Sequence, residues 1–301
     1  MVYKHVALIG LGLIASSIAL AIKRGKLTTK VTATSRSKST RSKASDLGIC
    51  NVVSTLQEAV KDADLIILCV PVGAMEEVFQ EIAPFLKSGS TLTDVGSVKA
   101  SIVDQIMPNL PKDVHFIPGH PIAGTEHSGP EAGLANLFDE RWCILTPSND
   151  TKPEILKNLI SFWENLGARV DTMEPEHHDL VLAVTSHAPH LIAFTMVGVA
   201  NDLENVTKSE IINYSAAGFR DFTRIAASDP TMWRDVFLRN KEASLKVLDR
   251  FTEELFLLRR AIIKEDGDYL HQYFSRTRAI RRRIIDAGQD TGEPDFGRGK
   301  T

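Results

Sequence analysis

Residues 5–25, HVALIGLGLIASSIALAIKRG, place a short apolar run, two glycines and an apolar segment of helical periodicity in direct succession. The apolar run predicts a buried strand. The segment from Leu13 predicts a helix that ends at Gly25. Strand, glycine turn and helix in this order are the opening unit of an α/β fold.

The same alternation continues to about residue 175. Further strands are predicted at residues 30–36, 64–73, 90–97, 114–119, 141–147 and 168–173, with helical segments between most of them. Apolar, β-branched strands that alternate with helices are typical of a parallel sheet covered on both faces. We therefore predict a Rossmann-type, doubly wound parallel sheet in a dinucleotide-binding domain of residues 1–175.

The rest of the chain has helical periodicity and predicts an all-α domain over residues 176–288. Residues 230–265 predict one helix of about 50 Å, longer than a domain of roughly 125 residues can cover. A homodimer built through the helical half would cover it, and a broken helix in a monomer is the alternative. The polar, glycine-rich residues 289–301 predict a mobile tail.

The composition is that of an ordinary globular protein, with 43% hydrophobic and 24% charged residues. A net charge of -3 gives no bulk positive field, so we expect a small-molecule partner and neither nucleic acid nor a membrane. Three widely spaced cysteines argue against a disulfide framework and favour the cytoplasm. Residues 6–22 superficially resemble a signal peptide or membrane span, but their glycines and serines suit a turn and helix better.

The glycine turn has the pattern G-x-G-x-x-A at Gly10, Gly12 and Ala15. Gly10 would permit the tight turn, Gly12 the approach of a pyrophosphate to the backbone, and Ala15 close packing of the helix. A glycine turn without a ligand is the alternative. The predicted cofactor-binding residues are Gly10, Gly12, Leu13, Ile14, Ser35, Arg36, Ser37, Val70 and Pro71.

NADP is the predicted cofactor, with NAD as the alternative. A preference for NAD would usually require an acidic residue at the end of the second strand, but none occurs between Gly25 and Asp46. The basic and hydroxyl-bearing stretch at residues 35–41 could instead bind a 2′-phosphate. An ordinary solvated loop would have the same composition.

The candidate catalytic residues lie in the loops after the fourth and fifth predicted strands. His120, held between Gly119 and Pro121, could take a hydroxyl proton while hydride leaves the same carbon. Ser97 is either a helix N-cap or a hydrogen-bonding partner of nicotinamide or substrate.

The helical half adds further polar groups. Ser186, His187 and His190 surround Pro189, which would kink a helix. Asp221 and Arg224 are three residues apart, where the arginine could clamp a carboxylate or simply form an ion pair. Residues 176–179, EHHD, invite a metal site, but no H-E-x-x-H motif or cysteine pair supports one, so we expect no metal.

Six stretches together resemble the prephenate and arogenate dehydrogenase family, and the resemblance extends from Val6 to about Leu270. They are ALIGLGLIASS (7–17), DLIILCVPV (64–72), TDVGSVK (93–99), GHPIAGTEHSG (119–129), TSHAPHLIAF (185–194) and AAGFRDFTRIAASDPTMWRDV (216–236). The resemblance implies oxidative decarboxylation of prephenate to 4-hydroxyphenylpyruvate in tyrosine biosynthesis, with NAD(P) as oxidant. Arogenate, which would give tyrosine directly, is the alternative substrate.

The resemblance also implies roles for single residues. His120 would deprotonate the ring hydroxyl, Ser97 would support it and the nicotinamide, and Arg224 would bind a substrate carboxylate. Ser186 and His190 would line the side-chain end of the pocket, and Glu126 and Asp221 would form an ionic gate. No role is implied for His127, which suits a surface residue.

The departures from the family pattern are small. Ala15 replaces the frequent third glycine, and the missing acid resembles the NADP-using members. We expect no chorismate mutase segment before the fold and no regulatory domain after Asp286. Feedback by tyrosine would therefore act in the active site or at the dimer interface. The rival assignments are a β-hydroxyacid dehydrogenase, which relies on a lysine in the helical part, and a nucleotide-sensing protein without chemistry.

Overall fold

The computed structural model describes residues 2–125, 127–202 and 217–286. The predictions about Glu126 and the 289–301 tail fall outside these residues. The chain forms two compact units, residues 1–244 and 245–301. The boundary predicted at residue 175 lies within the first unit and stays a prediction.

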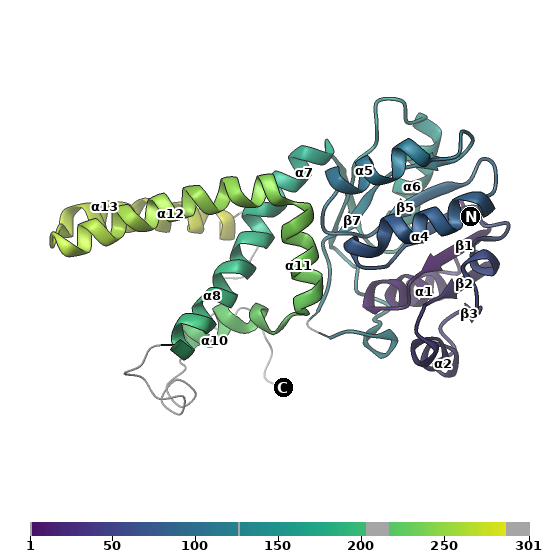
Figure 1. Ribbon diagram of the computed structural model, residues 1–301, viewed down its shortest axis with the longest axis horizontal. Helices are drawn as coiled ribbons and strands as arrows, with labels where there is room; N and C mark the ends of the chain where they lie inside the picture. The colour runs from purple at the N-terminus through teal and green to yellow at the C-terminus, as the bar shows by residue number, and fades with distance from the viewer. Residues whose placement is uncertain (1, 126, 203–216, 287–301) are drawn as a thin grey trace. The chain divides into compact units, whose positions relative to one another are not determined.

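Six parallel strands form the main sheet of the first unit, which confirms the predicted fold class (Figure 1). The spatial order is β3-β2-β1-β4-β5-β6. The strands are β1 (His5–Ile9), β2 (Lys30–Thr34), β3 (Asn51–Val52), β4 (Leu65–Leu68), β5 (Thr91–Asp94) and β6 (His115–Phe116). The order reverses between β1 and β4, the position at which open α/β sheets bind ligands.

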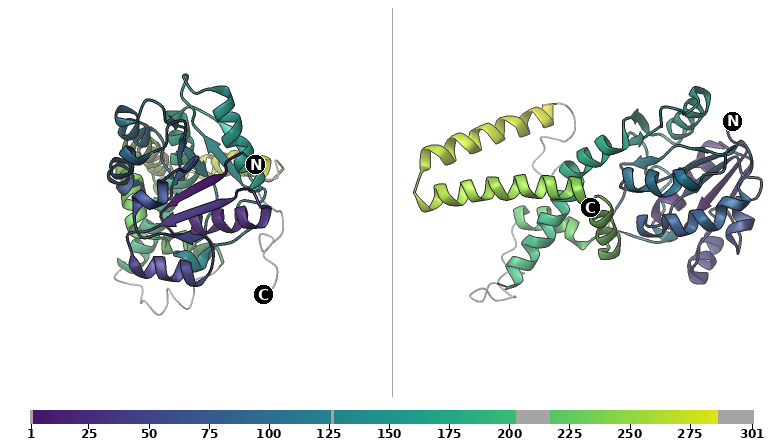
Figure 2. Two further views of the ribbon diagram at one scale, coloured as in Figure 1. Left: turned by 90° about the vertical axis from the view of Figure 1, so that its right-hand side faces the viewer. Right: turned by 45° about the horizontal axis from the view of Figure 1, so that its top comes forward.

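Helices cover both faces of this sheet (Figures 1 and 2). Val6 and Leu8 pack with α1 and α6 on one face, whereas Ala7 and Ile9 pack with α3, α4 and α5 on the other. The helices of this part are α1 (Leu13–Gly25), α2 (Lys38–Asp46), α3 (Leu56–Val60), α4 (Met75–Ile82), α5 (Ala100–Ile106) and α6 (Pro153–Asn165). Single 3-10 turns are η1 (Val72–Ala74), η2 (Ala83–Phe85), η3 (Met107–Asn109) and η4 (Pro130–Ala132). Burial on both faces explains why β1 is continuously apolar.

A second sheet corrects the expectation of a single parallel one. It contains β7 (Gly119–Pro121), β8 (Trp142–Leu145) and β9 (Arg169–Thr172), with β7 antiparallel to β8. The predicted strand at 114–119 divides because Pro118 has no N–H for the parallel ladder, and its carbonyl accepts from the Thr146 N–H at 2.9 Å. His120 therefore lies in a short strand of the second sheet, not in a loop after a fifth parallel strand.

The remaining helices follow residue 174. They are α7 (Pro175–Leu182), the π-helical turn η5 (Ala183–His187), α8 (Ala188–Asp202), α10 (Ala217–Thr223), the 3-10 turn η6 (Arg224–Ala227), α11 (Pro230–Arg239), α12 (Lys241–Ile263) and α13 (Gly267–Asp286). Trp233 and Val236 of α11 are buried in the same core as Val72 and Met75, so α11 packs on the β4 side of the main sheet.

The prediction of a single long helix over residues 230–265 is wrong. The chain leaves helical geometry at Asn240, with φ -112° and ψ 43°, between α11 and α12. The buried Asn240 amide donates to the Asp179 carbonyl at 2.8 Å, a contact that a continuous helix would not need. At ~1.5 Å per residue, α12 is about 35 Å long. Helix length alone therefore no longer requires a dimer, whereas the exposed apolar side chains on the helices still favour one.

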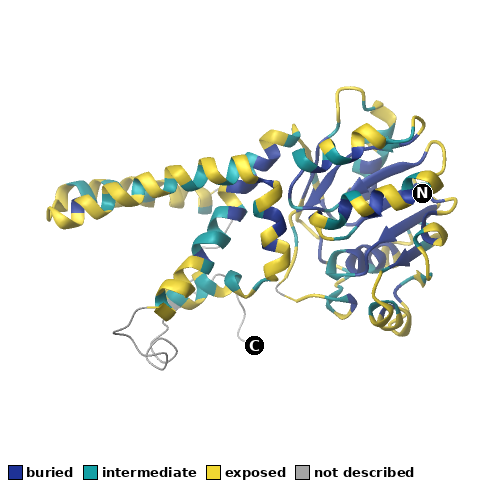
Figure 3. Ribbon diagram, viewed as in Figure 1, coloured by how far each residue is buried: buried dark blue, intermediate teal, exposed yellow. Residues whose placement is uncertain are grey.

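Burial differs strongly along the chain (Figure 3). The strands of the main sheet are largely buried, whereas α12 has one buried residue, Ala261, and α13 has none among the described residues. Exposed large apolar side chains on these two helices are Leu245, Leu255, Phe256, Leu257, Ile262, Ile263, Phe274, Ile280 and Ile284. Such a surface is unusual for a monomer and suits an interface.

We expect alanine substitutions at Gly10 and Gly12 to have different effects, the first on stability and the second on dinucleotide binding. Gly10 has φ +110°, and a Cβ there would lie 2.4 Å from the Cys69 carbonyl oxygen. We expect Gly10→Ala to lower the free energy of unfolding by about 2–4 kcal/mol because strain and overlap add. A Cβ at Gly12 meets open space in the described structure, so Gly12→Ala should leave the denaturation midpoint unchanged and weaken only dinucleotide binding. Urea denaturation and nucleotide titration of both variants test this; equal stability of the two would contradict it.

Candidate active site

The glycine turn lies at the carboxyl ends of β1, β2 and β4. The Gly10 N–H donates to the Thr34 carbonyl at 2.9 Å, and the Cys69 N–H donates to the Ile9 carbonyl at 2.7 Å. Gly12 is the N-cap of α1, and no side chain in the described structure caps this end. Free N-terminal amides above an open glycine are the arrangement that accepts a pyrophosphate. The structure thus brings Gly10, Gly12, Leu13 and Ile14 together at the switch point, where Val70 and Pro71 follow β4.

The basic residues after β2 make different contacts. Arg41 folds back, and its Nη1 donates to the carbonyls of Ser35 and Arg36. Ser37 is the N-cap of α2 and accepts from the Thr40 N–H at 3.2 Å. Arg36 is exposed and lies 3.8 Å from Glu77, a weak surface pair. Arg36 therefore presents its charge to solvent at the end of β2, as does the exposed Lys38 at the start of α2, whereas Arg41 supports the loop.

His120 begins a buried chain of hydrogen bonds. Its Nδ1 lies 2.9 Å from Nε2 of His178 on α7, and Nδ1 of His178 lies 2.8 Å from Oδ1 of Asp179. Asp179 also accepts from the backbone N–H of Lys99 at 2.7 Å and of Ala100 at 3.0 Å. One carboxylate therefore caps α5 and anchors the histidine chain.

The chain sets the tautomer of His120. An ionised carboxylate only accepts hydrogen bonds, so His178 donates from Nδ1 and accepts at Nε2. His120 must then donate from Nδ1, which leaves the lone pair on its Nε2 free to receive a proton. Burial lowers the pKa of His120 well below its ordinary value, and the neighbouring His178, Lys99 and His187 lower it further. The imidazole is therefore neutral near pH 7, the form that a general base requires.

Ser97 is not the cap of α5. The N-cap position belongs to Lys99, and the capping acceptor is the side chain of Asp179 from α7. A carboxylate that receives two amides makes a hydroxyl cap unnecessary. Ser97 is half-buried in the turn that follows β5, and its backbone faces His187.

The helical residues form a second cluster beside the histidine chain. The His190 ring stacks on Trp233, with centroids 3.9 Å apart, and its Nδ1 lies 2.8 Å from the Ser186 carbonyl. Burial lowers the pKa of His190, and the charge of Arg224 adds to this, which places Arg224 near the ring. Arg224 is the first residue of η6, and Asp221 lies one turn earlier on α10.

His187 connects the two clusters. It is fully buried, and its Nδ1 lies 3.1 Å from Nδ2 of Asn240. The same Asn240 amide donates to the Asp179 carbonyl. Burial lowers the pKa of His187 to about 4, with Asp179 and the Ser97 backbone opposing and His178 and His190 reinforcing the shift. The site is thus continuous from His120 to His190.

Several residues that the structure places in this candidate site have no site role in the sequence-based prediction. His178 and Asp179 were considered only as part of a metal site, and Trp233 only as an apolar residue of a helix. Asp94 and Lys99 lie inside the family motif at 93–99 but carried no assigned role. Glu176 and His177 are exposed, and no group of His, Cys, Asp and Glu in the described ranges is arranged to hold a metal.

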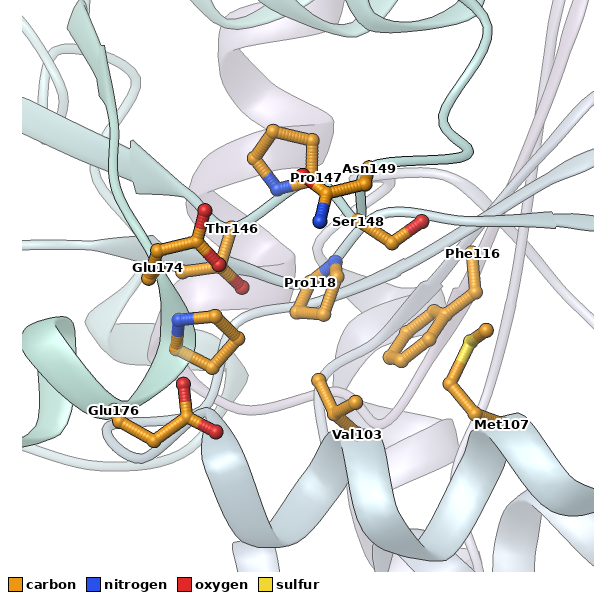
Figure 4. A pocket seen from close by; sticks show the side chains of 11 residues that line it. Val103, Met107, Phe116, Pro118, Thr146, Pro147, Ser148, Asn149, Glu174 and Glu176 are labelled. Carbon is orange, nitrogen blue, oxygen red and sulfur yellow. The ribbon is translucent and has the colours of Figure 1, made fainter.

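A pocket on the surface of the first unit lies elsewhere (Figure 4). Val103, Phe116 and Thr146 line it, with Glu174 and Glu176 among its polar residues. None of the described site residues belongs to its lining, so it is separate from the candidate active site.

Comparisons with known proteins identify the family. Residues 18–172 match the nucleotide-binding domain of prephenate dehydrogenase, and residues 174–276 match its dimerization domain. The chain is 44% identical over 281 residues to a cyclohexadienyl dehydrogenase of Zymomonas mobilis, covering 93% of this chain and 96% of that one. It is 36% identical to a prephenate dehydrogenase of Bacillus subtilis, covering 92% of this chain and 75% of that one.

Solved structures give the same result. Prephenate dehydrogenase from Aquifex aeolicus, in complex with hydroxyphenyl propionate and NAD+, has a TM-score of 0.85 and 36% identity, covering 93% of this chain and 98% of that one. Synechocystis arogenate dehydrogenase has a TM-score of 0.78 and 28% identity, covering 93% of this chain and all of that one, 100%. The chain therefore belongs to the prephenate dehydrogenase family and is an NAD(P)-dependent dehydrogenase.

Proposed function

We propose that the protein oxidises and decarboxylates prephenate to 4-hydroxyphenylpyruvate, with arogenate as the alternative or second substrate. The observation that carries this proposal is the buried chain from Asp179 through His178 to His120, which presents an unprotonated Nε2. A β-hydroxyacid dehydrogenase or a nucleotide sensor would not need such a base.

The dinucleotide fits the glycine turn. Gly12 leaves open space next to the uncapped first turn of α1, and Gly10 holds the turn against the end of β4. NAD(P)+ supplies the hydride acceptor when it is bound. The protein's own residues then have to bind the diphosphate, orient the ring of the substrate and receive one proton.

His120 would receive the proton of the ring hydroxyl at Nε2. As the O–H bond breaks, the carbonyl forms and hydride leaves the same carbon for the bound dinucleotide. The ring carboxylate would then depart as carbon dioxide, and the electron pair of the broken C–C bond would move through the ring onto the carbonyl oxygen, which takes a proton to become the phenol hydroxyl. The resulting ring is aromatic, which drives the reaction. The imidazolium charge that develops on His120 is stabilised through Nδ1 by His178 and, beyond it, by Asp179.

The second cluster suits the side-chain end of the substrate. Arg224 provides a guanidinium for a carboxylate, and His190 is held flat against Trp233 beside it. Ser186 and Asp221 complete the proposed pocket. Ser97, in the turn between β5 and α5, would support the hydroxyl or the nicotinamide.

His120→Asn tests the base. We expect kcat with prephenate to fall by about 10²- to 10⁴-fold, because a general base contributes on this scale, while dinucleotide affinity stays unchanged. Steady-state kinetics and nucleotide titration measure the two effects. His127→Asn is the matched control, since His127 is exposed on the following loop and should retain wild-type kcat. A near wild-type rate for His120→Asn would refute the assignment.

We also propose a preference for NADP. In support, the end of β2 carries no carboxylate and presents the exposed Arg36 beside Ser35 and Ser37. The Aquifex structure contains NAD+, so the preference depends on this chain's own residues at the end of β2.

One assay matrix tests substrate and cofactor together: prephenate and arogenate, each with NAD and NADP. We expect the highest kcat/KM with prephenate and NADP. Arg36→Ala should raise KM for NADP about tenfold, the loss of one charge-assisted contact, and leave KM for NAD unchanged. Lys112→Ala, an exposed cation before β6, is the control. Equal losses with both cofactors, or a wild-type preference for NAD, would contradict the NADP proposal.

We propose that the protein is a homodimer. The apolar side chains exposed on α12 and α13, with Val184, Met196, Val197 and Val199 near and on α8, support this, as does the match to a dimerization domain. The run from Pro175 to Asp202 is also long and apolar enough to span a membrane by composition alone. It contains the buried His178, Asp179 and His187, which favours a protein partner over lipid.

Light scattering tests the dimer. We expect a mass of twice 33.2 kDa for the wild type. Phe256 and Ile263 are seven residues apart on α12 and share a face, so Phe256→Asp combined with Ile263→Asp should shift the mass toward the monomer. Leu47→Asp adds a charge in the nucleotide-binding domain and should leave the mass unchanged. A monomeric wild type would contradict the proposal.

A cytoplasmic location fits the three free cysteines, Cys50, Cys69 and Cys143. Burial raises the pKa of the Cys50 thiol to about 11, which keeps it in the unreactive form. Tyrosine inhibition stays a prediction, with the active site or the dimer interface as its place of action.

A further inference from the structure

Two opposite charges are completely buried next to the site. The side chains of Asp94 and Lys99 are both 0% exposed and form an ion pair. Asp94 is the last residue of β5, and Lys99 occupies the N-cap position of α5. Burying two ions costs more than burying apolar side chains of the same size, so the pair is poor evidence for stability alone.

The pair holds Gly119 from both sides. Lys99 Nζ donates to the Gly119 carbonyl at 2.7 Å, and Asp94 Oδ1 accepts from the Gly119 N–H at 3.2 Å. Asp94 Oδ2 also accepts from the Gly96 N–H at 2.8 Å. Both peptide groups of the residue before His120 are therefore bound to one buried ion pair.

Lys99 contacts both ends of the histidine chain. Its side chain binds Gly119, next to His120, and its backbone N–H donates to the carboxylate of Asp179 at 2.7 Å. A shift of Lys99 would move the backbone of the base relative to the carboxylate that anchors its partner. Gly119 has little room to adapt, since a Cβ there would lie 3.1 Å from the Asp94 carbonyl oxygen.

We infer that Asp94 and Lys99 are positioning residues for the reaction: the buried pair fixes the Gly119 backbone and thereby aligns the His120 imidazole on His178. This rests on the proposed function of His120 as the base. Neither residue needs to touch substrate or cofactor. Their effect is transmitted through Gly119 and through the amide at the start of α5.

The charge of Lys99 adds an electrostatic contribution. The groups that surround His120 are Lys99 before α5, His178 on α7, His187 in η5 and Cys143 on β8, with Asp94 and Asp179 behind them. Burial contributes most to the low pKa of His120, followed by His178 and then Lys99. Removing the positive charge of Lys99 should raise this pKa. Since only neutral His120 acts as a base, the acidic limb of kcat/KM should then move to higher pH.

Two neutral double variants of the full chain test the inference. Asp94→Asn with Lys99→Met removes the charges and the donor to Gly119. We expect kcat with prephenate to fall about 10- to 100-fold, as for a misplaced catalytic group, with KM little changed. Asp94→Asn with Lys99→Gln removes the charges but restores a donor. It should recover most of kcat while its acidic limb stays shifted to higher pH.

Thermal denaturation and dinucleotide titration show whether each variant is folded, and Lys112→Met is the control for loss of an exposed lysine. Wild-type kcat and pH profile in both folded double variants would overturn the inference. If neither variant folds, the pair serves the fold itself and a specific role in positioning is also overturned. If His120→Asn is fully active, the proposed function fails; if it is inactive while both double variants remain normal, only this inference fails.

Discussion

The arrangement of the site depends on the hydrogen bonds that the carboxylate of Asp179 accepts. This carboxylate accepts hydrogen bonds from the backbone N–H groups of Lys99 and Ala100 at the start of α5 and from Nδ1 of His178, and it belongs to a different helix, α7. The N-terminus of α5 has no capping side chain of its own, and Asp179 of α7 caps it instead. This contact fixes α7 against the end of β5. The same oxygen atoms determine the direction of every hydrogen bond that leads to His120.

Direction matters because the imidazoles are neutral. Burial lowers the pKa values of His120, His178 and His187, so no positive charge orders them. A neutral imidazole is both donor and acceptor, and two adjacent rings could point either way. An acceptor-only group at one end removes this ambiguity. Asp179 provides that end, and a lone pair on Nε2 of His120 is left at the other end.

The sequence predicted the features that depend on local backbone geometry. The glycine turn, the alternation of strands and helices and the absence of an acid after β2 are all visible within a few residues. By contrast, Asn240 fits helical periodicity, and the helix breaks there because of partners 61 and 53 residues away, at Asp179 and His187. The strand at 114–119 divides at Pro118, where the direction of the next pairing depends on β8, about 25 residues later.

The site was predicted in part for the same reason. His120 stood out because a histidine between glycine and proline after a strand is a strong local signal. His178 and Asp179 looked like potential metal ligands, since a sequence shows residue types and not which ring nitrogen faces which atom. Nothing in the spacing of Asp94 and Lys99 indicates that both charges will be buried.

The π-helical turn at Ala183–His187 connects the predicted and unpredicted parts of the site. Pro189 cannot donate a hydrogen bond to the Thr185 carbonyl, and the helix widens immediately before it. In a regular α-helix of about 100° per residue, His178 and His187 would lie on opposite sides, since they are nine residues apart. The wider turn reduces that rotation, and His187 reaches the Asn240 amide that also binds the Asp179 carbonyl. The π-helical turn next to Pro189 therefore brings His187 to the Asn240 amide that links the two histidine clusters.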